Sequence, residues 1–562
     1  MSTDSRAALA PASAPPVKGY ELVAAALQRH RIDTVFFLMG GPMLGVASAC
    51  VERGIRMIDT RHEQGAAMMA HAFARVRTTP GVCMACSGPG TVNLTTGIAN
   101  AWIDCAPVLA LGGSSPISQF DKGAFQEIDQ VAVMKPVTKW AVRVHDASRI
   151  PEYVDRALRT AMAGKPGPVY LDLPGDVLYA DVDPASVRWA PVGEASMITR
   201  PAAEGGAVRR AIDLLCEARR PVMLSGSGSL WAGAGDAIRA FSEQLGIPVY
   251  TTPQGRGAVP EDHPEFFGHV RSTALREADV VLVVGTRLNY VFGFGEAPRF
   301  APDARLIRIE VDADELASGP PVRLGIIADA RVAVAQLAQE ARGRISPDLY
   351  RDWRGRLDGL QRDKLPRHEA QLANDQTPIH PLRLCREVRD LFARDAILVV
   401  DGNEILNYGR QSIPTFELGN RLNSGPFGIM GVGMPFGVGA KAAAPDRLVV
   451  VLHGDGSFGL NGFEIDTAVR HGLPVLVVVS NNGGWTGDPE RDKVGRDLAY
   501  SRYDRLAESL GAAGLHVERP EEIRPALERA LAMVREGRTV LVNVVTDWRA
   551  RAQPVNFSRY TT

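Results

Sequence analysis

Two clusters of polar and glycine residues follow two apolar, β-branched runs in the last third of the chain. Val449–Leu452 leads into Gly454–Gly456 (GDG), and Val475–Val479 leads into Asn481–Gly484 (NNGG). The segment between them, Phe458–His471, has apolar residues at helical spacing, so we predict a strand–helix–strand unit with both clusters at the carboxyl ends of neighbouring parallel strands. A carboxylate, an amide and glycine-exposed backbone oxygens suit a hard divalent cation such as magnesium, which keeps diphosphate oxygens among its ligands.

Either cluster alone would be compatible with a plain turn, because turns favour Gly, Asp and Asn. The spacing argues against that alternative, since Asp455 and Asn482 stand 27 positions apart, the length of one βαβ step. With this spacing the segment resembles the motif of thiamine-diphosphate enzymes, GDG followed by NN. The resemblance implies that Asp455, Asn482 and the backbone carbonyl of Gly484 hold magnesium. It also implies that the neighbouring residues contact the cofactor diphosphate: Gly454, Gly456 and Ser457.

A candidate catalytic carboxylate lies near the start of the chain. Glu63 follows an apolar run, Met57–Thr60, and begins an Ala/Met-rich helical pattern. By itself, a glutamate at a helix start is explained by the helix dipole. However, RHEQGA resembles the catalytic-glutamate motif of the same family. The resemblance implies that Glu63 hydrogen-bonds the pyrimidine ring of thiamine diphosphate and so promotes formation of its carbanion, while the cofactor supplies the carbanion chemistry.

Further positions match the family with less specific motifs. Ser87–Gly90 (SGPG) and Asn93 resemble a loop near the cofactor rings, and Gln126 in FQEIDQ resembles an active-site glutamine. The resemblance implies that the carbonyl of Gly428 accepts from the 4′-amino group and that Met430 bends the cofactor. The segment after the run Ala396–Val400 matches a diphosphate-contacting position, with two candidate residues: Asp401 and Asn403. The alternatives are β–α turns for the glycine-rich loops and a solvated loop for Gln126.

The bulk properties indicate a globular protein of several domains. A chain of 562 residues predicts roughly three or four domains. A net charge of −1 gives no general field for nucleic acid or a membrane surface, and no apolar run approaches the roughly 20 residues that a bilayer span needs. Six dispersed cysteines fit a reducing cytoplasm; Cys83 and Cys86 form a CxxC that we interpret as free core thiols rather than half of a zinc site.

Apolar runs that end in glycine turns alternate with helical patterns in three separate segments. This indicates an α/β protein with three doubly wound parallel-sheet domains. The expected boundaries are a disordered leader (1–16), a pyrimidine-binding domain (17–188), a central nucleotide-fold domain (200–342), a linker (343–378), a diphosphate-binding domain (379–547) and a C-terminal tail or lid (548–562). In the family that the chain resembles, the pyrimidine and diphosphate sites come from different chains. The resemblance therefore implies a homodimer at minimum, and a homotetramer is common.

The segment after the metal motif, NNGGWTGDPERD, is expected to decide the reaction. It approaches the pattern of oxalyl-CoA decarboxylases and 2-hydroxyacyl-CoA lyases more closely than that of acetolactate synthases. We therefore expect a lyase that cleaves a 2-hydroxyacyl-CoA to formyl-CoA and an aldehyde or ketone, with acyloin condensation as the reverse reaction. Glu490 is the candidate acid/base, against the alternative of a surface glutamate. The rival functions are oxalyl-CoA decarboxylase, acetolactate synthase and a non-enzymatic binding homologue.

Two further ligand sites follow from the same resemblance. The tail carries candidate contacts for the phosphates of coenzyme A, against the alternative of a frayed polar tail: Arg549, Arg551 and Arg559. In the central domain, three strand-end residues resemble nucleotide contacts, and any nucleotide bound there is expected to be of the ADP type: Arg287, Glu310 and Asp329. The glycine-rich Gly226–Gly235 does not have the spacing of the GxGxxG dinucleotide fingerprint.

Overall fold

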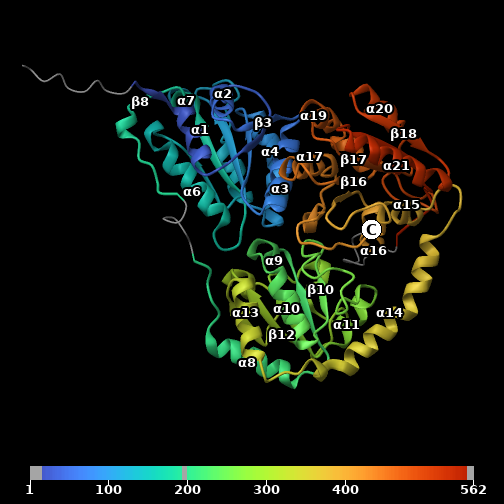
Figure 1. Ribbon diagram of the computed structural model, residues 1–562. Helices are drawn as coiled ribbons and strands as arrows, with labels where there is room; N and C mark the ends of the chain where they lie inside the picture. Colours follow the sequence, from blue (N-terminus) through green and yellow to red (C-terminus); the bar gives the residue numbers. More distant parts are fainter. Residues whose placement is uncertain (1–14, 193–198, 553–562) are drawn as a thin grey trace, which may run out of the picture.

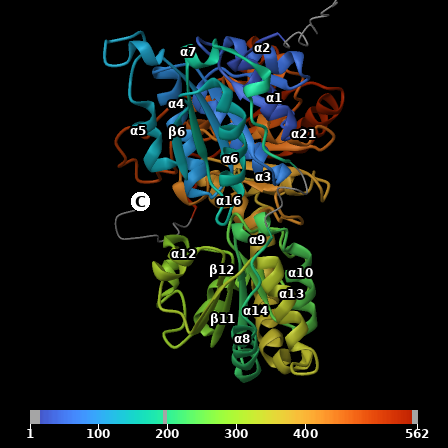
Figure 2. The same cartoon turned by 90° about the vertical axis from the view of Figure 1, so that its left-hand side faces the viewer.

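Three α/β domains make up the molecule. The structure is a computed structural model that describes residues 15–192 and 199–552. The first domain (blue to cyan in Figure 1) lies beside the third (orange to red), and the central domain (green) lies below both. The same stacking is seen from the side in Figure 2. The predicted leader falls outside the described residues except for its last two positions.

The first domain has a six-stranded parallel sheet in the order β3-β2-β4-β5-β7-β6. Its strands are β2 (Thr34–Phe37), β3 (Arg56–Asp59), β4 (Gly81–Ala85), β5 (Val108–Ser114), β6 (Trp140–Arg143) and β7 (Val169–Pro174). Helices α1 (Gly19–Arg29), α2 (Leu44–Glu52) and α6 (Ile150–Met162) share one core with the sheet, whereas α3 (Glu63–Arg77), α4 (Pro89–Ile103) and α5 (Gln130–Met134) share another. The sheet is therefore covered on both faces, which explains its continuous apolar strands. A short antiparallel pair, β1 (Val17–Lys18) with β8 (Asp181–Val182), joins the two ends of the domain, and α7 (Gly175–Leu178) lies between β7 and β8.

The central domain has a five-stranded parallel sheet in the order β10-β9-β11-β12-β13. Its strands are β9 (Pro221–Ser225), β10 (Val249–Thr251), β11 (Val280–Val284), β12 (Arg305–Glu310) and β13 (Leu324–Ile327). Its helices are α8 (Gly205–Glu217), α9 (Ser227–Ala232), α10 (Gly235–Leu245), α11 (Arg271–Glu277), α12 (Ala313–Ala317) and α13 (Ala330–Ala341). A long helix, α14 (Arg351–Leu372), then runs along the outside of the molecule to the third domain (Figure 1).

The third domain has the parallel order β15-β14-β16-β17-β19-β18. Its strands are β14 (Ile397–Asp401), β15 (Arg421–Leu422), β16 (Val449–Gly454), β17 (Leu476–Asn481), β18 (Ala513–Val517) and β19 (Val540–Val545). Helices α15 (Pro381–Arg389), α16 (Glu404–Ser412) and α21 (Pro520–Arg535) share one core with the sheet; α17 (Gly433–Ala443), α18 (Asp455–Asn461), α19 (Glu464–Arg470) and α20 (Tyr503–Ser509) lie on the other side. The predicted fold class of three doubly wound parallel-sheet domains is confirmed.

The first and third domains repeat one strand order, although their sequences show no tandem repeat. In each sheet, the second strand along the chain lies at the edge, beside the first. At the opposite edge, the last strand along the chain lies inside the strand that precedes it. The order reverses between β14 and β16 in the third domain and between β9 and β11 in the central one. Such switch points open a crevice at the carboxyl ends of the strands, where α/β sheets bind ligands.

The first and third domains also share a hydrophobic core. Helix α3 packs along α17, where a Cβ on Gly439 would lie 2.3 Å from the carbonyl oxygen of Met69. On its other side α3 packs against α4, where a Cβ on Gly97 would lie 2.6 Å from Ala67. The missing side chains let the helix backbones approach closely. Within the described residues, no helix combines the length and the apolar composition needed to cross a membrane.

The structure differs from the sequence expectations in two respects. The single helix expected over Phe458–His471 is two short helices, α18 and α19, that break at Gly462 and Phe463. Several short strands were not expected, among them β6, β13, β15 and β18, because their side chains lack the long apolar run that marks a buried strand. The cysteines Cys83 and Cys86 are free thiols, as expected, but only Cys83 is buried in the core and Cys86 is half-buried.

Candidate active site

The two polar clusters meet at adjacent strand ends. Strands β16 and β17 pair in parallel, with Gly454 opposite Ser480. Beyond the strands, the backbone N–H of Gly484 donates to Oδ2 of Asp455 at 2.8 Å. The structure therefore brings the carboxylate of the first cluster against the backbone of the second.

The oxygen atoms at this junction suit a hard divalent cation. Oδ1 of Asn482 is buried and accepts no hydrogen bond from the part of the chain that the structure describes. Asp455 is 1% exposed, and burial raises the pKa of its carboxyl to about 6 against the N–H groups that lower it. A bound Mg²⁺ would satisfy the orphaned amide oxygen and favour the charged carboxylate. Among the described residues, no three His, Cys, Asp or Glu side chains gather as a metal site. The candidate ligands at this junction are of a different kind, since they are one carboxylate, one amide and one backbone oxygen.

A narrow cleft lies over the switch point between β14 and β16. Gly402 has a φ of 121°, and a Cβ there would lie 3.1 Å from the amide nitrogen of Gly454. Glycine thus lets the two strand ends approach, and it adopts a backbone conformation that other residues avoid. Eight of the predicted cofactor residues line the cleft: Asn403, Met430, Gly454, Asp455, Gly456, Ser457, Asn482 and Gly484.

The carboxylate of Asp401 supports the loop that carries Met430. Its Oδ2 accepts from the N–H groups of Gly431 and Gly433 at 2.9 and 2.8 Å, and its Oδ1 accepts from Gly402 at 2.8 Å. Burial raises the pKa of Asp401 to about 6, and the backbone donors oppose that shift. The carboxylate faces backbone and does not line the cleft, so the structure places Asp401 behind the predicted contact position.

A larger pocket continues from the cleft towards the central domain. Its volume is about 440 Å³, and it shares Gly402, Asn403, Met430 and Trp485 with the cleft. Gly428, predicted to bind the cofactor amino group, lines this pocket with a φ of 70°. The two hollows therefore adjoin, and Met430 is one of the residues that separate them.

The candidate residues of the first domain form a second group. Nδ2 of Asn93 donates to Oε2 of Glu63 at 3.0 Å, and Oγ of Ser87 donates to Oε1 of Gln126 at 2.9 Å. Gln126 has a φ of 58°, and its carbonyl oxygen would lie 2.4 Å from a Cβ on Gly88. The SGPG turn and the FQEIDQ loop therefore pack tightly. Glu63 and Gln126 line neither the cleft nor the larger pocket of their own chain.

The remaining candidates of the substrate end lie outside both hollows. Glu490 is exposed on the loop after the metal motif, so its acid/base role stays a prediction. Arg549 is paired with Asp547, Nε to Oδ1, at 2.9 Å, and Arg551 is exposed. Arg559 lies outside the described residues.

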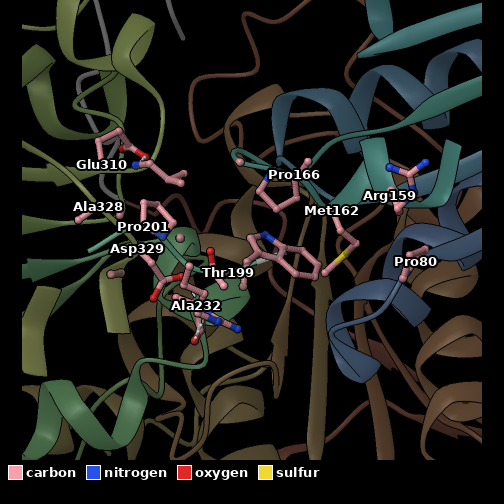
Figure 3. Close-up of a pocket in the computed structure, with 18 of the residues that line it drawn as sticks. Pro80, Arg159, Met162, Pro166, Thr199, Pro201, Ala232, Glu310, Ala328 and Asp329 are labelled. Carbon is pink, nitrogen blue, oxygen red and sulfur yellow. Dashed lines mark hydrogen bonds and ion pairs between the residues drawn. The ribbon is translucent and has the colours of Figure 1, made fainter. Parts of the chain in front are cut away.

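The three nucleotide candidates of the central domain divide between two hollows. Glu310 and Asp329 line a cavity of about 620 Å³ between the central and first domains (Figure 3). Arg287 instead lines the larger pocket of the third domain, where it donates to the carbonyl oxygen of Ile103. The cavity lies at the β9/β11 switch point, where a Cβ on Gly228 would lie 2.8 Å from the Cα of Gly285.

Sequence reasoning missed several residues that organise the site. Gln130 is 1% exposed; it accepts from the N–H of Gly88 and donates to Asp172. Arg496 is 5% exposed and donates to the carbonyl oxygen of Asn482 at 3.0 Å. Glu464 is also buried, and burial raises the pKa of its carboxyl to about 7. Their spacing from the motifs carries no signal, since their partners are backbone groups and side chains distant in sequence.

Comparison with known proteins agrees with this arrangement. The chain matches the models of the thiamine pyrophosphate enzyme N-terminal TPP binding domain at residues 17–133, the central domain at 208–337 and the C-terminal TPP binding domain at 407–544. It is 36% identical over 560 residues to a probable acetolactate synthase of Mycobacterium bovis, covering 97% of this chain and 98% of that protein.

Two relatives with other names match at a similar level. The chain is 31% identical to human 2-hydroxyacyl-CoA lyase 1, over 96% of both chains. It is 32% identical to the oxalyl-CoA decarboxylase of Escherichia coli, over 94% of this chain and 95% of that one. These relatives are named for three different reactions, so similarity alone does not identify the reaction of this chain, and the residues of the site must be used instead.

Proposed function

The chain belongs to the thiamine pyrophosphate enzyme family, and from that premise we propose that it is a lyase that cleaves a 2-hydroxyacyl-CoA to formyl-CoA and an aldehyde or ketone. The bond that breaks joins C1, the thioester carbonyl carbon, to C2, which carries the hydroxyl group. C2 gives up the hydroxyl proton and becomes the carbonyl of the released product, and C1 gains a proton to become formyl-CoA. The reverse reaction is an acyloin-type condensation of formyl-CoA with a carbonyl compound.

The shared lining of the cleft and the larger pocket carries this proposal. Thiamine diphosphate, when bound, supplies a carbanion nucleophile. The oxygens of Asp455 and Asn482 would hold its diphosphate through Mg²⁺, and Met430 would support the rings at the entrance to the larger pocket. A substrate carbonyl held in that pocket would therefore lie beside the reactive ring.

The charge of the larger pocket favours an anionic substrate that extends away from the cleft. Asn403, which precedes the first residue of α16, lines it together with Leu406 and Arg410 of that helix, so Arg410 lies about 10 Å along the helix axis from Asn403. Nε of Arg410 is buried without a hydrogen-bond partner, and no carboxylate in the described residues forms an ion pair with it. Burial and the neighbouring guanidinium groups of Arg271 and Arg256 lower the pKa of Arg410 to about 10. A phosphate group of coenzyme A would supply the missing negative charge.

Replacing Arg410 with Met should raise KM for the acyl-CoA substrate by at least about tenfold and leave kcat within about twofold, because a charge-assisted hydrogen bond contributes roughly 1.5–3 kcal/mol. Steady-state kinetics give both values. Arg276→Met, an exposed position on α11, is the matched control and should leave KM unchanged. A loss in kcat at constant KM would contradict a substrate-binding role for Arg410.

Two rival functions remain within the same family, acetolactate synthase and oxalyl-CoA decarboxylase. Incubation with 2-hydroxyacyl-CoA, oxalyl-CoA or pyruvate distinguishes them by product. The lyase gives formyl-CoA with an aldehyde or ketone, the decarboxylase gives formyl-CoA with carbon dioxide, and the synthase gives acetolactate. Turnover of pyruvate alone would refute the proposed reaction.

We also propose that the catalytic unit is at least a homodimer and that a tetramer forms from two such units. Glu63 and Gln126 lie away from the cleft of their own chain, although both are expected to act on the cofactor. A second copy that presents its Glu63 to this cleft would complete the site. Two-fold symmetry would then complete both sites at once.

For the cavity between the central and first domains we propose an ADP-type nucleotide. Glu310 is a buried carboxyl at the end of β12, where burial raises its pKa, and it could accept hydrogen bonds from ribose hydroxyls. Asp329 caps α13 and pairs with Nη1 of Arg200 at 2.7 Å. Calorimetric titration tests this ligand: ADP should bind the protein and bind Glu310→Leu at least about tenfold more weakly. Equal affinity of ADP for both proteins would exclude this cavity as the ADP-binding site.

We propose a cytoplasmic location as well. All six cysteines are free thiols, which supports a reducing compartment.

A further inference from the structure

The carboxylate of Glu404 joins three parts of the third domain. Glu404 is the first residue of α16, is 9% exposed and lines the cleft. Its Oε1 accepts from Oγ1 of Thr486 at 2.7 Å and from the N–H of Gly487 at 3.2 Å. Its Oε2 accepts from the N–H of Ala552 at 2.6 Å. One side chain therefore connects the strand end beside the cleft with two segments that are distant in sequence.

The first of these segments is the loop that follows the metal motif, residues 482–496, called the metal loop below. The second is the C-terminal segment, residues 547–552. The two are packed directly on each other, since a Cβ on Gly487 would lie 2.3 Å from the carbonyl oxygen of Ala550. The N–H of Asp488 donates to the carbonyl oxygen of Trp548 at 3.0 Å, and the guanidinium of Arg491 lies 4.2 Å from the Trp548 ring centre.

Arg496 extends this contact to the metal ligands. Its guanidinium donates to the carbonyl oxygens of Asn482 at 3.0 Å and Thr486 at 2.6 Å. The same group reaches the carbonyl oxygen of Trp548 at 3.5 Å. The backbone that presents Asn482 and Gly484 is thus held by a buried cation that also contacts the C-terminal segment. A displacement of that segment would remove partners from both Arg496 and Glu404.

We propose that Glu404 is a positioning residue that fastens the C-terminal segment to the metal loop, so that binding of Mg²⁺ with thiamine diphosphate and docking of the C-terminal segment strengthen each other. The two effects are linked thermodynamically: if the docked segment favours the arrangement of Asn482 and Gly484 that binds the metal, the metal must favour the docked segment by the same factor. This inference needs the family's cofactor but not the particular acyl-CoA reaction.

Trypsin tests one direction of the linkage, because Arg551 precedes the residue whose N–H is bonded to Glu404. Mg²⁺ with thiamine diphosphate should slow cleavage after Arg551 in the wild-type protein by about tenfold, within the range of typical coupling energies. Glu404→Gln keeps an acceptor for Thr486 but replaces the oxygen that faces Ala552 with an amide NH2 group. Because this group cannot accept from the N–H of Ala552, the cofactor-dependent protection should disappear. Glu536→Gln, an exposed position after α21, should keep it.

Calorimetric titration of the cofactor in the presence of Mg²⁺ tests the other direction. Glu404→Gln should weaken binding by the factor that protection loses in the trypsin experiment. Ala552→Pro removes the N–H donor while residue 404 remains glutamate, and it should weaken cofactor binding equally. The double variant should be no weaker than either single one, because both remove the same interaction.

Three results would overturn the proposal. Unchanged protection in Glu404→Gln would show that Glu404 does not hold the segment. Lost protection with unchanged affinity would show that the segment and the metal loop are not coupled. Tighter cofactor binding in Glu404→Gln would show that the carboxylate acts mainly by repelling the diphosphate. Because these readouts are independent of turnover, they stand even if the acyl-CoA proposal fails.

Discussion

Glu63→Gln is expected to lower kcat by about 10²–10⁴-fold, the range for loss of a general acid–base group, while thiamine diphosphate still binds within a fewfold of the wild-type affinity. The amide retains the shape of the side chain and a hydrogen bond to Asn93, but it cannot exchange a proton with the pyrimidine ring. Glu63 is 6% exposed, and a Cβ on Gly90 would lie 3.3 Å from its Oε1, so bulk water has little access to the carboxyl group. Steady-state kinetics and calorimetric titration of the cofactor measure the two quantities separately.

The matched control for Glu63 is Glu52→Gln, an exposed glutamate at the end of α2 that should leave both quantities unchanged. If Glu63→Gln kept more than about a tenth of the wild-type kcat, a catalytic role for this carboxylate would be refuted. A large loss of cofactor affinity with normal kcat at saturation would instead assign Glu63 to binding.

Asp455→Ala should weaken Mg²⁺-dependent binding of thiamine diphosphate by at least about 100-fold, since loss even of outer groups around a metal costs 10–100-fold. The substitution removes the anionic member of the proposed ligand set and also the acceptor for the N–H of Gly484. Asn482→Leu should have a similar effect, because the orphaned Oδ1 is the second side-chain oxygen of the set. Calorimetric titration at several Mg²⁺ concentrations measures the effect.

Asp466→Ala is the control for the metal ligands, because this aspartate lies on α19 and pairs with Arg470 at the surface. Its variant should bind the cofactor normally. If Asp455→Ala bound the cofactor as tightly as the wild-type protein at every Mg²⁺ concentration, the proposed metal site would be wrong.

Mixing the two inactive variants tests whether one site draws on two chains. Refolded together in equal amounts, Glu63→Gln and Asp455→Ala chains would form mixed dimers in which one site carries both defects and the other carries neither. About a quarter of the wild-type activity should return, because half of the dimers are mixed and each has one intact site. No recovery would place Glu63 and Asp455 in the site of a single chain.

The sequence predicted the strands that carry the site because those strands are buried on both faces. Val449–Leu452 and Val475–Val479 consist of β-branched and leucine residues in unbroken runs, and all of them are fully buried in the structure. The glycine-rich ends were equally predictable, since Gly402 and Gly428 adopt positive φ values that other residues avoid. Short edge strands such as β15 were not predicted, because two residues are too few to show the alternation or the apolar run of a strand.

The supporting contacts could not be predicted, since they join residues far apart in the sequence. Asp401 matched a diphosphate-contacting position, yet its carboxylate is used by the backbone of Gly431 and Gly433. Glu404 stands three residues later in the same segment and was not predicted as a site residue, yet it binds Thr486 and Ala552. Which oxygen faces the cofactor and which faces backbone depends on loop geometry that neither periodicity nor composition encodes.

The division of the nucleotide candidates has the same origin. Arg287, Glu310 and Asp329 all lie at or just after the ends of strands in one sheet, which is why the sequence grouped them. The chain after β11 turns towards the third domain, so Arg287 lines the larger pocket, whereas Glu310 and Asp329 face the first domain. The position of a residue at a strand end predicts the edge of the sheet at which it lies. It does not predict which domain its side chain contacts.

Cleavage between C1 and C2 of a 2-hydroxyacyl-CoA is tested most directly by running the reaction in D₂O and analysing the formyl-CoA by mass spectrometry. Because C1 gains its proton from the medium after the bond breaks, we expect formyl-CoA with one deuterium on the formyl carbon, formed together with an unlabelled aldehyde or ketone. The Glu63→Gln variant should not form this product. Absence of formyl-CoA from the wild-type reaction, or formyl-CoA without deuterium, would contradict this cleavage.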